Sequence, residues 1–333
     1  MSTNQKLRAV KKSFRQKGGT AMENVKSQIL TRFNDDSSLS QALRYFAEVT
    51  LHKPLPVFPA LINMSCEAVG GNPEKAAPFA EAIVFISAAA DLHDDVIDQS
   101  TQKNGNQTVL GKYGAVTAIL AGDTLLSEGF KRLSEAGGQV SKKNFEEILQ
   151  LVNDSIFGIC KAENLEAQSH RKTDLRPDEF MEIAKLKAVV PELSMKIGAV
   201  LGGARLEDIE ALGQFGRAYG VATIIAEEFA DLLEFNEFKS RLKNECPPLP
   251  VVYALQNAQI KKTLLPLLDT EALSKTTHRA IVEIVLESEE VNLLQKTFVS
   301  EAKVATKKLP KPINGKNREE LENLLLVPLA YFE

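Results

Sequence analysis

Four aspartates lie within eight positions of one short segment. They are Asp91, Asp94, Asp95 and Asp98, in the sequence AAADLHDDVIDQS at residues 88–100. At about 100° per residue of a helix, all four fall on one face about 100° wide. Like charges three and four residues apart destabilise a helix by about 0.2–0.5 kcal/mol per pair. We therefore expect either a fully solvated face or a bound positive charge, and the apolar run IVFISAAA just before it favours a face that opens into a cavity.

A second segment, GVATIIAEEFADLLEF at residues 220–235, repeats this arrangement. Glu227, Asp231 and Glu234 have the same i, i+4, i+7 spacing as Asp91, Asp95 and Asp98, and Glu228 adds a further carboxylate. Oxygen ligands suit a hard cation such as Mg²⁺, which binds one or two carboxylates together with waters and substrate phosphates. A solvated face explains either segment alone. The two together favour two carboxylate walls that face one pocket.

Other metal or nucleotide sites do not fit the sequence. It contains neither an HExxH motif nor a GxxxxGK loop. A di-iron bundle needs Glu-x-x-His twice. The residues three positions before the four histidines are Val49, Ala90, Ala167 and Lys275, none of them a glutamate.

The elements that must position these acids have helical periodicity throughout. Apolar residues recur at spacings of three and four, strand alternation is scarce, and the breaks between segments carry turn residues. No linker is long enough to divide the chain, so we expect one all-α domain over residues 1–333. The clearest helical segments are 81–98, 115–133, 143–167, 177–204, 215–235 and 278–309.

Composition limits the partners and the compartment. The net charge of −4 argues against nucleic acid as a partner. The three cysteines are far apart and odd in number, which fits a reducing cytoplasm better than a disulfide framework. We expect no apolar run long enough to span a membrane. The basic segment 1–35 is interpreted as a peripheral arm or the start of an amphipathic helix, with at most peripheral contact to acidic lipid, or simply as a solvated terminus.

Several blocks of the sequence resemble the trans-isoprenyl diphosphate synthases, the polyprenyl synthetase family. DDVID at 94–98 matches the first aspartate-rich motif of that family, DDxxD. Further blocks follow in the family's order over about residues 40–330. They are CEAVGGNPEKA (66–76), KYGAVTAILAGDTLLSEGF (112–130), FMEIAKLKA (180–188) and PPLPVVYAL (247–255).

The resemblance implies an isoprenoid (terpenoid) synthase fold, a single large helical bundle around a central cavity, and usually a homodimer. In this family two or three Mg²⁺ ions hold the diphosphate of an allylic prenyl substrate between two acidic walls. The metals promote the departure of diphosphate, and the allylic cation that remains adds to the double bond of isopentenyl diphosphate. The implied metal ligands are Asp94, Asp95 and Asp98 on one wall and Glu227, Glu228 and Asp231 on the other.

The same resemblance implies basic residues for the diphosphate. Lys187 matches a diphosphate-binding lysine and joins Asp94, Asp95 and Asp98 as a catalytic residue, while Lys53 and Lys103 are further diphosphate-binding positions.

One helical turn before Asp94, the chain-length pocket is expected at Ala89 and Ala90, with Phe85 and Ile86 deeper. Alanines there would leave room for a long tail, although small residues also permit tight helix packing. Asp91, where the family commonly has an apolar residue, would pair with a nearby lysine or serve as an additional metal ligand.

Other positions depart from the family pattern, mostly on the isopentenyl diphosphate side. The second motif reads EEFAD instead of DDxxD, and GKRxRP reads HKPLPV, which places Pro54 and Pro56 where arginines belong. Ser87 replaces a histidine and Cys246 replaces a lysine. Proline and serine lack the guanidinium group with which arginine binds phosphate through two hydrogen bonds. We therefore expect a degraded isopentenyl diphosphate site beside a retained allylic site.

Three functions follow from this pattern. The first is a diverged prenyltransferase that passes the prenyl group to isopentenyl diphosphate or another acceptor. The second is a terpene-synthase-like enzyme that ionises the allylic diphosphate without isopentenyl diphosphate. The third is a non-catalytic subunit that forms a heteromer with a paralogous synthase. The intact DDVID block places the prenyltransferase first.

Overall fold

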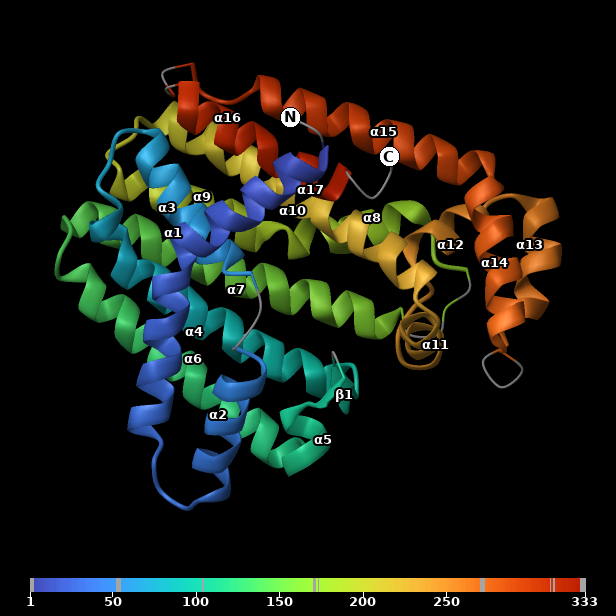
Figure 1. The fold of residues 1–333 in the computed structure, drawn as a ribbon, viewed down its shortest axis with the longest axis horizontal. Coiled ribbons are helices and arrows are strands. Elements are labelled where there is room, and N and C mark those ends of the chain that lie inside the picture. Colours follow the sequence, from blue (N-terminus) through green and yellow to red (C-terminus); the bar gives the residue numbers. More distant parts are fainter. Residues whose placement is uncertain are drawn as a thin grey trace.

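The computed structural model describes residues 3–51, 55–103, 105–169, 172, 174–269, 273–311, 313 and 315–329. Within them the chain is almost wholly helical, which confirms the all-α prediction (Figure 1). The only strands there form a two-residue hairpin that pairs Gln102 with Gln107. The first elements are α1 (Thr3–Arg32), α2 (Ser38–Val49), α3 (Val57–Ala68), α4 (Pro73–Ile97), β1 (Gln102–Lys103), β2 (Asn106–Gln107), α5 (Val109–Tyr113) and α6 (Ala115–Gly137).

The second half of the chain continues with long helices and then shorter ones (Figure 1). They are α7 (Lys142–Gln168), α8 (Pro177–Lys187), α9 (Val189–Leu201), α10 (Leu206–Leu233), α11 (Phe235–Asn244), α12 (Leu249–Ala254), α13 (Ala258–Leu264), the 3₁₀ turn η1 (Leu265–Leu268), α14 (Lys275–Glu287), α15 (Glu289–Lys307), α16 (Gly315–Leu324) and α17 (Leu326–Leu329).

Helix α4 is the central element, because it packs against α6, α3, α1 and α9. It begins with Asn72 as the cap, whose side chain accepts from the backbone N–H of Glu74, and with Pro73 at the first helical position. It ends at Ile97, after which Gln99 takes a left-handed φ of 54°. The acidic motif therefore lies at the carboxyl end of the helix, where the macrodipole is negative.

Close helix packing around α4 and α9 depends on glycine. A Cβ atom at Gly122 of α6 would lie 2.3 Å from Nε2 of His93, and one at Gly198 of α9 would lie 2.1 Å from the backbone oxygen of Ile62. Both distances are far below van der Waals contact. At Gly198 the neighbour is backbone that cannot move aside, so α9 and α3 approach this closely only with glycine there. At Gly122 the neighbour is the side chain of His93 on α4.

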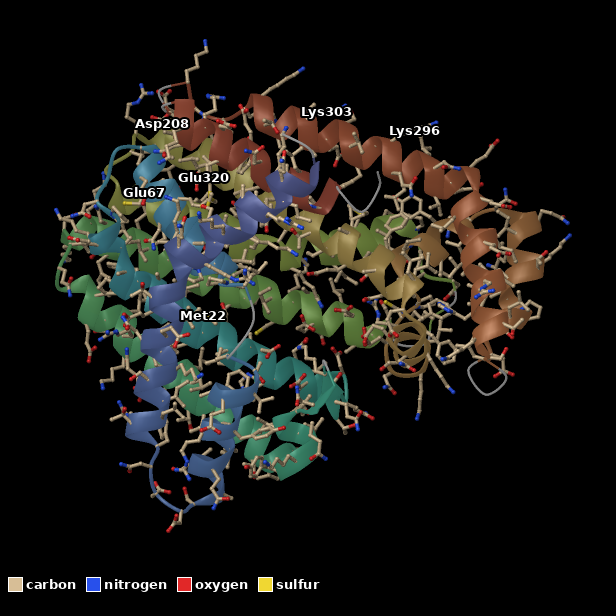
Figure 2. The ribbon with its side chains drawn as sticks, in the orientation of Figure 1. Met22, Glu67, Asp208, Lys296, Lys303 and Glu320 are labelled. Atoms are coloured by element: carbon tan, nitrogen blue, oxygen red, sulfur yellow. The ribbon has the colours of Figure 1, made fainter. Side chains whose placement is uncertain are left out.

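Helix α1 corrects the prediction of a peripheral N-terminal arm. Its side chains Val10, Phe14, Val25 and Ile29 are between 0 and 3% exposed and belong to the core. Lys17 forms ion pairs with Glu67 of α3 and Glu320 of α16, two residues labelled in Figure 2. An apolar stripe at helical spacing explains the difference, since the basic residues occupy only the outer face.

Helix α4 also corrects the reading that no segment could span a membrane. By length and composition alone, Pro73–Ile97 passes as a candidate span, and 61% of its apolar window is buried inside the protein. In the structure this helix lies within the bundle and contacts α3 and α6 on its sides. Its hydrophobicity is therefore accounted for by helix packing.

The position of α1 predicts a large cost for truncating its core residues. Phe14→Ala should lower the free energy of unfolding by about 3–5 kcal/mol, because it removes a fully buried aromatic side chain. Gln16→Ala, on the exposed side of the same helix, should change it by less than about 0.5 kcal/mol. Urea denaturation followed by circular dichroism measures both. Equal, small changes in the two variants would contradict the integration of α1 into the core.

Candidate functional site

The first acidic wall is the carboxyl end of α4. Asp95 is 5% exposed, whereas Asp94 and Asp98 are partly exposed one turn apart. Burial, together with the repulsion of Asp94, raises the pKa of Asp98 to about 7. Burial also raises the pKa of Asp94, against the opposing charges of Lys187 and Lys103. Burial and mutual repulsion thus disfavour the charged form of these carboxyl groups.

Lys103 of β1 approaches the same wall from the hairpin that follows α4. Its Nζ donates to Asp91 Oδ1 at 2.7 Å and lies 3.8 Å from Asp95 Oδ1. Asp91 is therefore held by a lysine, as the pairing alternative predicts. Because Lys103 remains 46% exposed, it can still approach a ligand at the edge of the wall.

Lys187, the last residue of α8, is held by two glutamates of α7. Its Nζ lies 3.1 Å from Glu163 Oε1 and forms a close ion pair with Glu166. These carboxylates raise the pKa of Lys187, so the side chain stays protonated despite its burial. The same ammonium acts on the pKa values of Asp94 and Asp98. Helices α7 and α8 therefore place a paired ammonium within electrostatic reach of Asp94 and Asp98.

The second acidic segment lies on α10, and Glu227 is its exposed member in the EEFAD motif. Its side chain is exposed to solvent, yet surrounding protein raises its pKa to about 7, with Asp231 and Glu228 adding repulsion. Lys187 and Lys103 both act to lower the pKa of Glu227. The same two lysines act on Asp94, so Glu227 shares an electrostatic neighbourhood with the end of α4. The arrangement of two acidic walls about one space stays a prediction.

The other two acids of the second segment are held by Arg241 of α11. Its Nη1 and Nη2 donate to the two oxygens of Glu228 at 2.9 and 3.1 Å, and Nη1 also donates to Asp231 Oδ2 at 2.7 Å. Glu228 is 6% exposed. Breaking such a buried pair by removing one partner typically costs about 3–5 kcal/mol. Glu228 and Asp231 are thus already engaged within the protein.

The oxygen donors of the first wall fit a divalent cation shared with a substrate. Among the residues that the structure describes, no three His, Cys, Asp or Glu side chains are gathered closely enough to hold an ion by themselves. Mg²⁺ commonly takes one or two carboxylates and completes its shell with water and phosphate oxygens. Asp94 and Asp98 match that requirement, because their carboxylates lie one turn apart and make no ion pair within the described chain. The metal-binding roles remain predictions.

Helix geometry divides the four predicted pocket residues into two pairs. At about 100° per residue, Ala90 and Ile86 lie about 40° and 80° from Asp94 around α4. Ala90 is exposed and Ile86 is partly exposed, packing against Gly129 of α6. Ala89 and Phe85 lie about 140° and 180° from Asp94 and are 1% and 2% exposed. The place of these two residues in the chain-length pocket stays a prediction.

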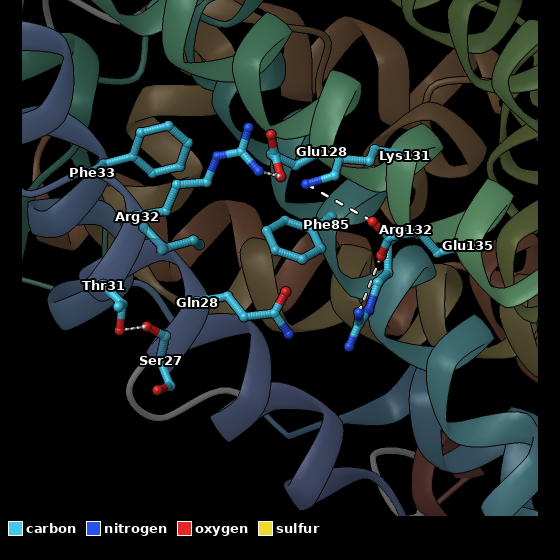
Figure 3. A pocket seen from close by; sticks show the side chains of 11 residues that line it. Ser27, Gln28, Thr31, Arg32, Phe33, Phe85, Glu128, Lys131, Arg132 and Glu135 are labelled. Carbon is cyan, nitrogen blue, oxygen red and sulfur yellow. Dashed lines mark hydrogen bonds and ion pairs between the residues drawn. The ribbon is translucent and has the colours of Figure 1, made fainter.

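Phe85 lines a cavity of about 460 Å³ between α1, α4 and α6 (Figure 3). The charges around this cavity neutralise one another. Arg32 donates to Glu128 at 2.7 Å, and Arg132 donates to Glu135 at 3.3 Å. Arg132 also pairs with the buried Glu81. The basic side chains at this cavity are thus paired with acids, and they are not directed at the acidic motifs.

Some predicted positions lie elsewhere or cannot be placed. Lys53 and Pro54 lie outside the described residues, and so does Asn104. Ser87 is partly exposed on the face of α4 that carries Asp94. Cys246, which stands where the family has a lysine, is fully buried with its Sγ 3.9 Å from Nη2 of Arg241. Burial raises the pKa of the Cys246 thiol to about 12, so it supplies no charge for a phosphate.

Sequence reasoning missed Glu163, Glu166 and Arg241. The sequence hints weakly at Glu163 and Glu166, since their i, i+3 spacing places both carboxylates on one face of a long helix. For Arg241, the only local hint is the i, i+4 spacing that lets it pair with Glu245. Its contacts with Glu228 and Asp231 depend on how α11 folds back on α10, which local spacing does not reveal.

Comparisons with known proteins agree with this fold. The model of the polyprenyl synthetase family matches residues 38–285. The short chain isoprenyl diphosphate synthase of Methanothermobacter thermautotrophicus is 35% identical over 180 residues, 54% of this chain and 54% of that protein. The octaprenyl diphosphate synthase of Escherichia coli is 24% identical over 281 residues, 80% and 81% of the two chains. The chain spans about half the length of the first curated relatives that it matches.

Solved structures extend the fold over nearly the whole chain. Geranylgeranyl pyrophosphate synthetase from Pyrococcus horikoshii Ot3 superposes with a TM-score of 0.82 at 23% identity, covering 96% of this chain and 98% of that one. Polyprenyl synthase from Caulobacter crescentus CB15, complexed with calcium and isoprenyl diphosphate, gives a TM-score of 0.80 at 20% identity, covering 96% and 97%. The helical bundle with its acidic helix ends is the isoprenoid synthase fold. The family match covers most of the sequence, and the chain belongs to the polyprenyl synthetase family.

The raised pKa values predict how stability depends on pH when divalent ions are absent. Asp95, Asp98, Glu163, Glu227 and Glu245 all have a folded-state pKa raised to about 7, mainly by burial. The folded chain therefore binds protons more tightly than the unfolded chain, and stability falls as pH rises toward and through about 7.

Thermal unfolding in a chelator between pH 5.5 and 8.5 should show a Tm that decreases over this range. Glu227→Gln should flatten the decrease, because it removes one titrating carboxyl. Glu146→Gln, on the exposed side of α7, is the matched control and should leave the slope unchanged. A Tm that rises with pH in the wild type would contradict the prediction.

Proposed function

We propose that this protein is a Mg²⁺-dependent prenyltransferase that acts on an allylic prenyl diphosphate. The observation that carries the proposal is the open carboxylate pair of Asp94 and Asp98, which faces the fixed ammonium of Lys187. Carboxylates that form no ion pair suit a metal, and a lysine near them suits the diphosphate that would share the metal. The names of the curated relatives support the same chemistry.

Some residues of the chain would bind the metal, and others would stabilise the charge of the diphosphate. Asp94 and Asp98 would hold the metal from the end of α4, with Asp95 behind them and paired toward Lys103. Bound Mg²⁺ would neutralise charge that develops on the departing diphosphate. Lys187 would donate to a diphosphate oxygen, and Glu163 and Glu166 would keep it protonated and aimed. Ala90 and Ile86 would border the groove for the prenyl tail.

The acceptor side would be weak for isopentenyl diphosphate. Ser87 and the buried thiol of Cys246 stand at two positions where the family has a histidine and a lysine. Each lost charge-assisted hydrogen bond removes about 1.5–3 kcal/mol of binding. This observation keeps a second candidate function open, namely ionisation of the allylic diphosphate without isopentenyl diphosphate.

Incubation of the purified protein with Mg²⁺ and labelled allylic diphosphates of increasing length separates these functions. We expect diphosphate release, with elongated diphosphates when isopentenyl diphosphate is present. A hydrocarbon or alcohol formed from the single substrate would support the second candidate instead. No diphosphate release under any pairing would exclude catalysis by this chain alone and leave a non-catalytic subunit that needs a paralogous partner.

Lys187→Met should lower kcat/KM in that assay by about 10²–10³-fold, because it removes a charged donor from the leaving diphosphate. Lys161→Met is the matched control, since Lys161 is a half-exposed lysine on α7 that pairs with Glu182 at 3.2 Å. The control should retain activity near that of the wild type. Equal activity of the two variants would remove Lys187 from the proposed site.

We also propose that the protein forms a homodimer through α6 and α7. Val116, Ile119 and Leu120 lie on one face of α6 and are 73, 42 and 49% exposed, and Phe157 of α7 is 74% exposed. An apolar face of this kind on a folded chain favours burial against a second copy. A heteromer with a paralogous synthase could use the same surface.

Charge on this face should prevent the association. Leu120→Glu combined with Phe157→Glu should convert the dimer to a monomer in light scattering after size-exclusion chromatography. Leu206→Glu and Leu233→Glu are matched controls, because these exposed leucines of α10 lie outside the proposed interface. A dimer that survives the α6–α7 substitutions would place the interface elsewhere.

The cytoplasmic location, the absence of a nucleic acid partner and, at most, peripheral membrane contact stay predictions.

A further inference from the structure

Arg241 occupies the interior of the second acidic wall, which consists of Glu227, Glu228 and Asp231. Its side chain is 6% exposed, and its terminal nitrogens face both oxygens of Glu228 at 2.9 and 3.1 Å. The same Nη1 reaches Asp231 Oδ2 at 2.7 Å. A guanidinium therefore fills the space between these two carboxylates, where an ion bridging them would have to lie.

The lone pairs of Glu228 are nearly all used. Besides the two nitrogens of Arg241, its Oε2 accepts a hydrogen bond from the backbone N–H of Leu249 at 2.9 Å. A carboxylate has about four lone-pair sites, so little capacity remains for a metal. Glu245 Oε2 lies 2.7 Å from Nε of Arg241 and closes the guanidinium from the other side. A metal at Glu228 would have to displace this buried guanidinium.

The first wall differs in this respect. Asp94 and Asp98 make no ion pair within the described chain, and Lys103 binds Asp91 and only approaches Asp95, at 3.8 Å. The two walls are thus unequal. One leaves two carboxylates open to the site, and the other leaves only Glu227 without a partner among the described residues.

We infer that Arg241 is the resident cation of the second wall and takes the place of a divalent ion there. The inference rests on the proposed function, and it replaces the predicted metal-binding roles of Glu228 and Asp231. The ions that accompany the diphosphate are then held from the first wall. Glu228, Asp231 and Arg241 act as positioning residues that fix α11 and the segment before α12 against α10.

Counting bound Mn²⁺, used in place of Mg²⁺, tests this in the full-length protein with saturating inorganic pyrophosphate. The free-ion signal in electron paramagnetic resonance gives the number of ions bound. Asp98→Asn should lower that number by at least one ion per chain, or weaken the binding at least tenfold. Asp231→Asn should leave both the number and the affinity of bound Mn²⁺ unchanged within about twofold.

A second pair of variants tests the role of the guanidinium directly. Arg241→Met should bind one Mn²⁺ more than the wild type, with a larger rise of Tm on adding Mn²⁺. In Arg241→Met combined with Glu228→Gln, the additional ion should be lost. Should Arg241→Met not fold, Glu228→Gln in the wild-type background replaces it, and its Mn²⁺ count should equal that of the wild type.

The possible results keep the two proposals apart. A wild-type protein that binds no Mn²⁺ with pyrophosphate overturns the proposed function, and this inference falls with it. A wild type that binds Mn²⁺ and loses an ion through Asp231→Asn or Glu228→Gln overturns the inference alone. A folded Arg241→Met that gains no ion also counts against it.

Discussion

Repulsion among carboxylates at the end of α4 is the constraint on which the site depends. Three acids lie where the helix dipole is also negative, and the pKa of each is raised. A free chain would relieve this by fraying the last turn. Here it cannot, because α6 and α3 hold the helix along its length and the 99–103 turn brings Lys103 back onto it. The remaining negative charge is what the proposed metal ion would neutralise, and that ion would in turn bind the diphosphate.

The two acidic segments solve the same electrostatic problem in different ways. On α10, the protein supplies its own cation, and Arg241 satisfies Glu228 and Asp231. On α4, a lysine takes Asp91, the acid furthest from the motif, and leaves Asp94 and Asp98 open. Lys187 with its two glutamates adds a third charged cluster whose position is set by α7 and α8. The site is therefore asymmetric although its sequence motifs look alike.

Much of the fold could be predicted, because helical periodicity and turn residues are local. The all-α bundle and the long helix before DDVID follow from them. The burial of α1 is harder to predict, since its charges are conspicuous and its apolar stripe is sparse. The chain-length pocket is harder still, because positions near Asp94 in sequence do not all share its helix face. Phe85 is nine positions away and lies about 180° from Asp94 around α4.

The sequence by itself determined which residue types are present and how each helix distributes them. It thereby specified two acidic helical faces, a family resemblance and the loss of arginines on the isopentenyl diphosphate side. Only the tertiary structure decided which acids remain open. Glu227 and Glu228 are adjacent and chemically identical, yet one faces the site and the other is buried against Arg241. The reason is that a carboxylate's role depends on the nearest cation in space, and Arg241 reaches α10 only after the chain has folded back.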